Sequence, residues 1–94
     1  MTTKEEIIVS IASLLGVSPP KISTGSTEPR EIFDLVDVTL GLGLGSGLTK
    51  PELARAIVEA SGECWNADYD SRGGTVTRDG LLAVHRAVAY FVAH

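Results

Sequence analysis

A chain of 94 residues, 44% of them hydrophobic, has the size and composition of one small folded domain with an aliphatic core, which argues against a disordered chain. Eight basic and twelve acidic residues give a net charge of −4, so any nucleic-acid contact must use a local cluster of basic side chains. The single cysteine, Cys64, excludes an internal disulfide, and no apolar run has the form of a signal peptide or the length of a membrane span. We therefore expect a cytoplasmic protein that makes no membrane contact.

The first predicted element is an amphipathic helix that begins after Thr3 and ends near Gly16. Thr3 and Glu6 have the spacing of a capping box, in which hydroxyl and carboxylate bond to reciprocal backbone N–H groups. Apolar residues then recur at helical spacing: Ile7, Ile11, Leu14 and Leu15. The next stretch, residues 17–27, contains two adjacent prolines and predicts an irregular surface connection.

A second helix is expected to begin near residue 27 or 28, with Pro29 in its first turn. Its inner face is predicted from helical spacing: Ile32, Leu35, Val36 and Leu40, widened by Phe33. A glycine-rich run, residues 41–47, follows this helix. Leu42 and Leu44 alternate with glycine there, which predicts either a short extended piece or a loop whose leucines point inward.

Two more helices are predicted in the second half, joined by a long polar loop. Thr49 and Glu52 form a second capping box, and Gly62 is a natural C-terminal stop. Residues 75–77 have β-branched character and predict a very short strand, before a helix that starts at Thr77 or Asp79. The predicted inner faces are Leu53, Ala54, Ile57 and Val58 in the third helix, and Leu81, Val84, Val88 and Phe91 in the fourth.

These elements predict a mainly α fold with residues 1–94 as a single helical domain. The four helices are expected to form a compact, helix-turn-helix or winged-helix-like arrangement with at most a minor β-hairpin.

No catalytic or metal-binding set can be assembled from the sequence. The glycine run lacks the lysine that a phosphate loop needs directly after its last glycine. The acidic loop 68–79 resembles a calcium loop, but Arg72 stands where an oxygen ligand is required. Cys64 is predicted to pack as a small hydrophobe next to Trp65, which closes one end of the core, and His85 is predicted to be partly buried. We expect no enzyme activity, no cofactor, no metal and no small-molecule substrate.

The basic residues of the second half are the candidates for a nucleic-acid contact: Lys50, Arg55, Arg72, Arg78 and Arg86. Arg78 and Arg86 are eight residues apart, about 80° around one helix, so both can share an outer face. Arg72 precedes the predicted strand. In a helix-turn-helix protein, the N-terminal residues of the second helix contact base edges, and arginines of nearby loops contact phosphates.

Three pieces of the second half carry a resemblance to a known family: residues 48–59, Trp65 and residues 71–82. Within the span from Leu40 to Phe91, they resemble the small helical, winged-helix-like accessory domain of bacterial restriction-endonuclease-like proteins. The resemblance implies DNA targeting or protein contact, with hydrolysis located elsewhere. The chain lacks the paired acid and lysine set with which such nucleases hold magnesium, and its loop between helices three and four is longer than a standard turn.

These observations lead to one hypothesis and one alternative. The hypothesis is a non-catalytic DNA-recognition or targeting module of a restriction or defence-type nuclease, in which Arg72 and Arg78 contact phosphate and Arg86 assists. The alternative is a protein–protein interaction module that docks or oligomerises without nucleic acid. Its docking patch would combine an acidic surface, the leucines of the glycine loop (Leu42, Leu44 and Leu48) and an exposed Trp65 or Tyr69. Basic side chains that converge on one face favour duplex DNA, whereas arginines paired with the carboxylates at positions 68, 70 and 79 favour a protein partner.

Overall fold

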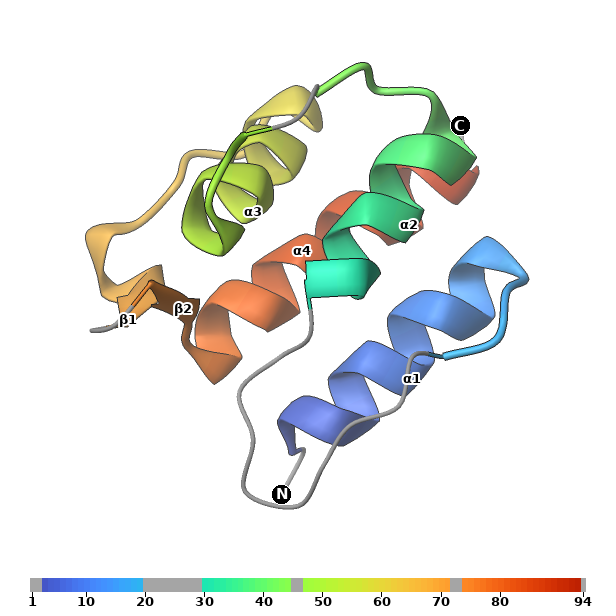
Figure 1. The fold of residues 1–94 in the computed structure, drawn as a ribbon, viewed down its shortest axis with the longest axis horizontal. Coiled ribbons are helices and arrows are strands. Elements are labelled where there is room, and N and C mark those ends of the chain that lie inside the picture. Colours follow the sequence, from blue (N-terminus) through green and yellow to red (C-terminus); the bar gives the residue numbers. More distant parts are fainter. Residues whose placement is uncertain (1–2, 20–29, 45–46, 72–73, 94) are drawn as a thin grey trace.

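The described part of the chain forms four α-helices and one two-stranded sheet (Figure 1). The computed structural model describes residues 3–19, 30–44, 47–71 and 74–93. The helices are α1 (Lys4–Leu15), α2 (Arg30–Leu40), α3 (Lys50–Ala60) and α4 (Arg78–Ala93). Between α3 and α4 lie the 3-10 turn η1 (Ala67–Tyr69) and the antiparallel strands β1 (Asp70–Ser71) and β2 (Thr75–Val76). The predicted four-helix fold with a minor hairpin is confirmed.

The helix starts follow from local sequence. Thr3 accepts the backbone N–H of Glu6 at 3.2 Å and completes the capping box of α1. Thr49 donates its own N–H to the Glu52 carboxylate at 2.9 Å in the matching box of α3. Both predicted boxes are confirmed, and Gly16 ends α1 in the left-handed conformation with φ of 72°. The predicted start of the second helix at residues 27–29 lies outside the described residues.

One buried apolar cluster joins the helices. α4 packs against α1 and α3, and α2 also packs against α1 and α3. In Figure 1, α1, α2 and α3 lie around α4. The buried members include most of the predicted inner faces: Ile7 and Ile11, Ile32, Phe33 and Val36, Leu53, Ala54, Ile57 and Val58, Leu81, Val84 and Val88. The core is thus aliphatic apart from Phe33, as the composition indicates.

The inner face of α2 differs from its prediction at one residue. Ile32, Phe33 and Val36 are fully buried, and Leu40 is half-buried against the core. Leu35 is also half-buried, but it lines a groove on the outer side of the helix. The prediction for Leu35 was wrong because Phe33 occupies the inner face, and Leu35 lies about 100° around the helix from Val36 on the side away from Phe33.

The glycine run after α2 is a loop whose described leucines point inward. Leu42, Leu44 and Leu48 are half-buried and pack against the core, which confirms one of the two predicted alternatives. Asp37 holds the loop on α2: its carbonyl oxygen accepts the N–H of Leu42 at 3.1 Å, and its carboxylate accepts the N–H of Leu44 at 3.1 Å. These three leucines therefore contribute to the core with part of their surface.

Candidate functional site

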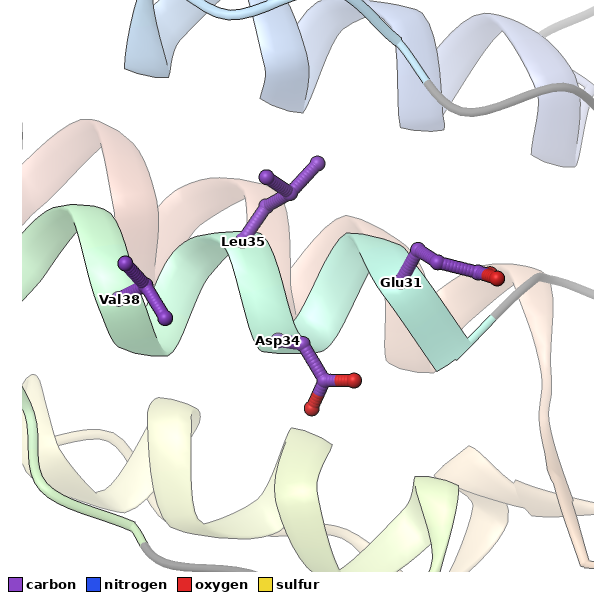
Figure 2. A pocket seen from close by; sticks show the side chains of 4 residues that line it. All are labelled: Glu31, Asp34, Leu35 and Val38. Atoms are coloured by element: carbon purple, nitrogen blue, oxygen red, sulfur yellow. The ribbon is translucent and has the colours of Figure 1, made fainter.

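The outer face of α2 carries a groove of about 400 Å³. Among the described residues it is lined by Glu31, Asp34, Leu35 and Val38, and Figure 2 shows their side chains projecting from one helix. Their spacing of three and four residues places them in one stripe along two turns. This surface, the α2 stripe, combines two carboxylates with two aliphatic side chains.

Val38 is the most informative member of the α2 stripe. Its side chain is 79% exposed, whereas Phe33 and Val36 of the same helix are fully buried. Val38 lies about 160° around the helix from Val36, so it sits opposite the core. A single exposed valine is common on a protein surface. Val38 stands out because it borders a groove beside a second aliphatic side chain, Leu35.

Among the described residues, the Asp34 carboxylate of the α2 stripe makes one weak ion pair. Asp34 receives the guanidinium of Arg30, with Nε 3.7 Å from Oδ2, and the two side chains are 43% and 54% exposed. An exposed pair four residues apart contributes about 0.3–0.5 kcal/mol. Solvent or an incoming charged group can therefore replace Arg30 at little cost.

Sequence reasoning missed the α2 stripe because it placed Leu35 on the inner face and assigned no role to Val38. The signal was present, since an aliphatic residue at position 38 falls outside the apolar arc that runs through Ile32, Phe33 and Val36. Helical periodicity identifies the side of a helix that faces the core. An aliphatic residue outside that periodicity is expected to be exposed on the opposite side.

The connection between α3 and α4 is fastened to α4 by Thr77. The Thr77 hydroxyl accepts the N–H of Gly80 at 3.2 Å and donates toward the carbonyl oxygens of Asp68 and Tyr69, at 3.2 and 3.1 Å. Its backbone N–H also donates to the Tyr69 carbonyl at 2.9 Å. Thr77 therefore caps α4, which agrees with the first of the two predicted starts, and holds η1 against the same helix end.

Gly80 allows this close approach. A methyl group at its α-carbon would overlap Val76 Cγ1 and lie 2.9 Å from the carbonyl oxygen of Tyr69. The backbone of the connection thus occupies the space that any other side chain would need.

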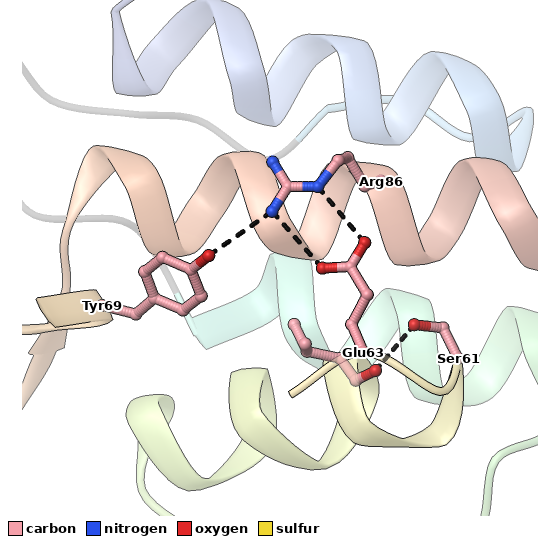
Figure 3. Close-up of polar contacts among 5 residues, drawn as sticks. Ser61, Glu63, Tyr69 and Arg86 are labelled. Atoms are coloured by element: carbon pink, nitrogen blue, oxygen red, sulfur yellow. Dashed lines mark hydrogen bonds and ion pairs between the residues drawn. The ribbon is translucent and has the colours of Figure 1, made fainter. Parts of the chain in front are cut away.

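Arg86 provides a second attachment between α4 and the segment that connects it to α3 (Figure 3). Its Nε lies 3.2 Å from one Glu63 carboxylate oxygen, and its Nη2 lies 3.3 Å from the other and 3.5 Å from the Tyr69 hydroxyl. The hydrogen bond to Glu63 raises the pKa of Arg86 above its already high ordinary value, so the guanidinium stays charged. Ser61 closes α3 just before this pair, donating its hydroxyl to the Val58 carbonyl at 2.6 Å.

Trp65 and Tyr69 pack together against the core. Their rings meet edge to face, with centroids 5.1 Å apart, and both side chains are half-buried against the core. Trp65 therefore packs against the core, as the sequence predicts. Cys64, predicted to be packed, is exposed. Its neighbours Glu63 and Trp65 turn toward α4 and the core, which leaves the intervening side chain directed outward.

Two of the predicted DNA-contact residues, Arg55 and Arg86, form separate ion pairs with glutamates. Arg86 is paired with Glu63, and Arg55 is paired with Glu59 on its own helix, with Nε 3.3 Å from the carboxylate. Lys50 and Arg78 are the first residues of α3 and α4. Arg72 lies outside the described residues.

The pairing differs in detail from the expected one. Arg55 and Arg86 pair with glutamates, and not with the aspartates at positions 68, 70 and 79. Asp70 instead accepts the indole N–H of Trp65 at 3.4 Å. Two of the four described basic candidates are nonetheless neutralised by an adjacent carboxylate.

Within the part of the chain that the structure describes, no group of three or more His, Cys, Asp or Glu side chains is placed to hold a metal ion. None of the described helices combines the length and the apolar character needed to cross a membrane. No family model, curated protein or solved structure matches the chain.

Proposed function

We propose that this chain is a protein-interaction module that docks a partner on the α2 stripe. The proposal depends on Leu35 and Val38, which line a groove on the side of α2 that faces away from the core. Complete burial of an aliphatic side chain of this size is worth about 1.5–3 kcal/mol. Val38 is 79% exposed and Leu35 is half-buried, so a partner that covers both side chains gains part of this free energy for each.

Charge supports a protein partner over DNA. The chain has a net charge of −4, and the carboxylates of Glu59 and Glu63 lie next to Arg55 and Arg86. Exposed ion pairs contribute at most about 1 kcal/mol and open readily, so they do not lock either arginine away. They do cancel the positive potential that attracts phosphate. The exposed free thiol of Cys64 supports a reducing, cytoplasmic location as part of this proposal.

Site-specific photo-crosslinking tests the proposal. A benzophenone amino acid at position 38 is expected to capture a discrete protein in cells of the source organism, because that side chain lies at the docking surface. The matched control is the same probe at Val9, an exposed aliphatic residue of α1 that is 45% accessible. Identical cross-linking patterns from positions 38 and 9 would contradict the proposal.

DNA targeting beside a nuclease stays a prediction, and a separate measurement decides it. Under the interaction proposal, duplex DNA binds with Kd no tighter than about 100 μM at physiological salt, the weak end of non-specific binding. If the chain instead binds DNA through α4, Arg78→Ala reduces affinity for many sequences alike and lowers the salt slope by about one unit. Titrations of the native chain and this variant at two salt concentrations separate the two outcomes.

A further inference from the structure

We infer that the segment docked on the α2 stripe is a cationic amphipathic helix of the partner protein. The inference rests on the proposed function and specifies its partner. It follows from the shape of the stripe and from its charge.

The shape of the α2 stripe suits another helix. Glu31 and Leu35 are four residues apart, as are Asp34 and Val38, so each pair forms one of the inclined ridges with which helices pack. The groove is lined by both ridges. A ridge of side chains on a partner helix fits between two such ridges, at an interaxial distance of about 8–10 Å. From residue 31 to residue 38 the helix rises about 10 Å, which is enough for two turns of a partner.

The charge of the α2 stripe selects the partner. Glu31 and Asp34 lie toward the N-terminal end of the stripe, and Val38 lies toward its C-terminal end (Figure 2). A partner helix that covers Leu35 and Val38 with apolar residues must place other residues next to the two carboxylates. Lysine or arginine at those places gains attraction, and the weak pair between Arg30 and Asp34 can be exchanged for an intermolecular one.

The same charge disfavours two other occupants. A second copy of this chain brings another net charge of −4 and the same carboxylates to the interface. An anionic membrane surface is repelled by the carboxylates that border the groove. A helix with an apolar stripe and basic flanks meets both requirements of the surface.

Three helical probe peptides test the inference against the full chain. They share one length and one leucine–alanine stripe, and their flanking positions carry lysine, glutamine or glutamate. Titrated into the ¹⁵N-labelled protein at low salt, the lysine peptide is expected to shift the amides of α2 and to bind about fivefold more tightly than the glutamine peptide. The glutamate peptide is expected to bind most weakly, and high salt removes the difference.

Charge variants locate the preference. Glu31→Gln is expected to bring the lysine and glutamine peptides to within about twofold of each other. Glu5→Gln, in the exposed first turn of α1, is the matched control and leaves the fivefold preference intact. Far-UV circular dichroism confirms that both variants keep their helices.

Equal affinity for all three peptides at α2 would overturn the cationic partner and leave the docking function standing. Peptide shifts confined to other helices, or no shifts at α2 with any peptide, would also overturn the inference. The proposed function is decided independently by cross-linking at position 38. A cross-linked partner segment that contains no basic residues would also overturn the cationic partner and leave the docking function standing.

Discussion

Gly80 shows how a helix can require its weakest helix former. Alanine is about 1 kcal/mol better than glycine in a helix interior, so helix propensity alone favours Gly80→Ala. The methyl group would instead meet Val76 and the Tyr69 carbonyl oxygen, and a backbone atom cannot move as freely as a side-chain tip. We expect Gly80→Ala to lower the free energy of unfolding by about 1–2 kcal/mol, as overpacking does. Urea unfolding measures this change.

The control for Gly80→Ala is Asp79→Ala. Asp79 is the exposed neighbour in the first turn of α4, and its carboxylate lies near the positive end of the helix dipole. Its removal is expected to cost no more than about 1 kcal/mol. If the Gly80→Ala protein is more stable than the native chain, the connection does not pack closely enough against Gly80 to exclude a methyl group.

Arg86 and Arg55 are both exposed, but their ion pairs have different structural roles. Arg86 joins α4 to the end of α3 through both oxygens of Glu63, whereas Arg55 pairs with Glu59 within one helix. We expect Arg86→Ala to cost about 1 kcal/mol and Arg55→Ala about 0.3–0.5 kcal/mol. Only Arg86→Ala is expected to shift the emission of Trp65 to longer wavelength, because it frees the segment that carries the indole. If both variants lose the same free energy of unfolding and neither changes the Trp65 emission, the Glu63–Arg86 pair does not hold the connecting segment on α4.

The capping boxes contribute to stability one helix at a time. Thr49→Ala removes an acceptor for the N–H of Glu52 and is expected to cost about 1 kcal/mol at neutral pH. Thr39→Ala, at an exposed position inside α2, is the control and is expected to stabilise slightly, because alanine is the better helix former. Thermal unfolding followed by circular dichroism compares the two variants.

The loss caused by Thr49→Ala is expected to depend on pH. The N–H and the side chain of Thr49 bond to the carboxylate of Glu52 and lower its pKa below the ordinary value of 4.5. A carboxyl group with a lowered pKa in the folded state stabilises that state above its ordinary pKa, and the stabilisation is lost as the pH falls through the lowered value. The difference between Thr49→Ala and the native chain should therefore shrink between pH 5 and the acid range. Because Thr49→Ala keeps the backbone N–H and loses only the hydroxyl, a difference that is constant from neutral to acid pH would contradict the bond between the Thr49 side chain and Glu52.

The accuracy of the sequence predictions follows the range of the interactions involved. The boxes at Thr3 and Thr49 involve residues three apart, so local sequence is sufficient to predict them. The pair between Glu63 and Arg86 spans 23 residues, and sequence spacing contains no sign of it. The space around Gly80 is likewise set by the fold of the connection, which no local pattern encodes.

The candidate site could be predicted less well than the fold. Basic residues in the second half were the natural candidates because arginine is the usual phosphate contact, but their neighbours in space decide their charge balance. Leu35 and Val38 are ordinary aliphatic residues, and only the rotation of α2 on the core shows that they face outward. Residue type indicates chemistry, and exposure has to come from the packed structure.

The whole chain buries surface as a self-sufficient monomer does. Its accessible surface of 5355 Å² is close to the roughly 5200 Å² expected for a folded protein of 9.9 kDa. The α2 stripe is therefore not needed to complete the core. We expect Val38→Asp to change the free energy of unfolding by less than about 0.5 kcal/mol, as an exposed substitution does.

The same variant is expected to abolish partner capture, with the cross-linking probe moved to position 35. Val9→Asp provides the comparison, because it places the same charge on an exposed valine of α1. A Val38→Asp protein that unfolds more easily, or that keeps its partner, would argue against a docking role for this face.

The aromatic pair of the connection provides an optical reporter. The chain has one tryptophan, and Trp65 lies at the edge of the aliphatic core and not within it. Its fluorescence consequently follows the detachment of η1 and its neighbouring residues 61–71 from α4, while amide exchange in the same protein follows the opening of the core. If the Trp65 fluorescence changes at a lower denaturant concentration than the amide exchange of the core, the protein opens in two stages. The connection that contains the hairpin then separates first.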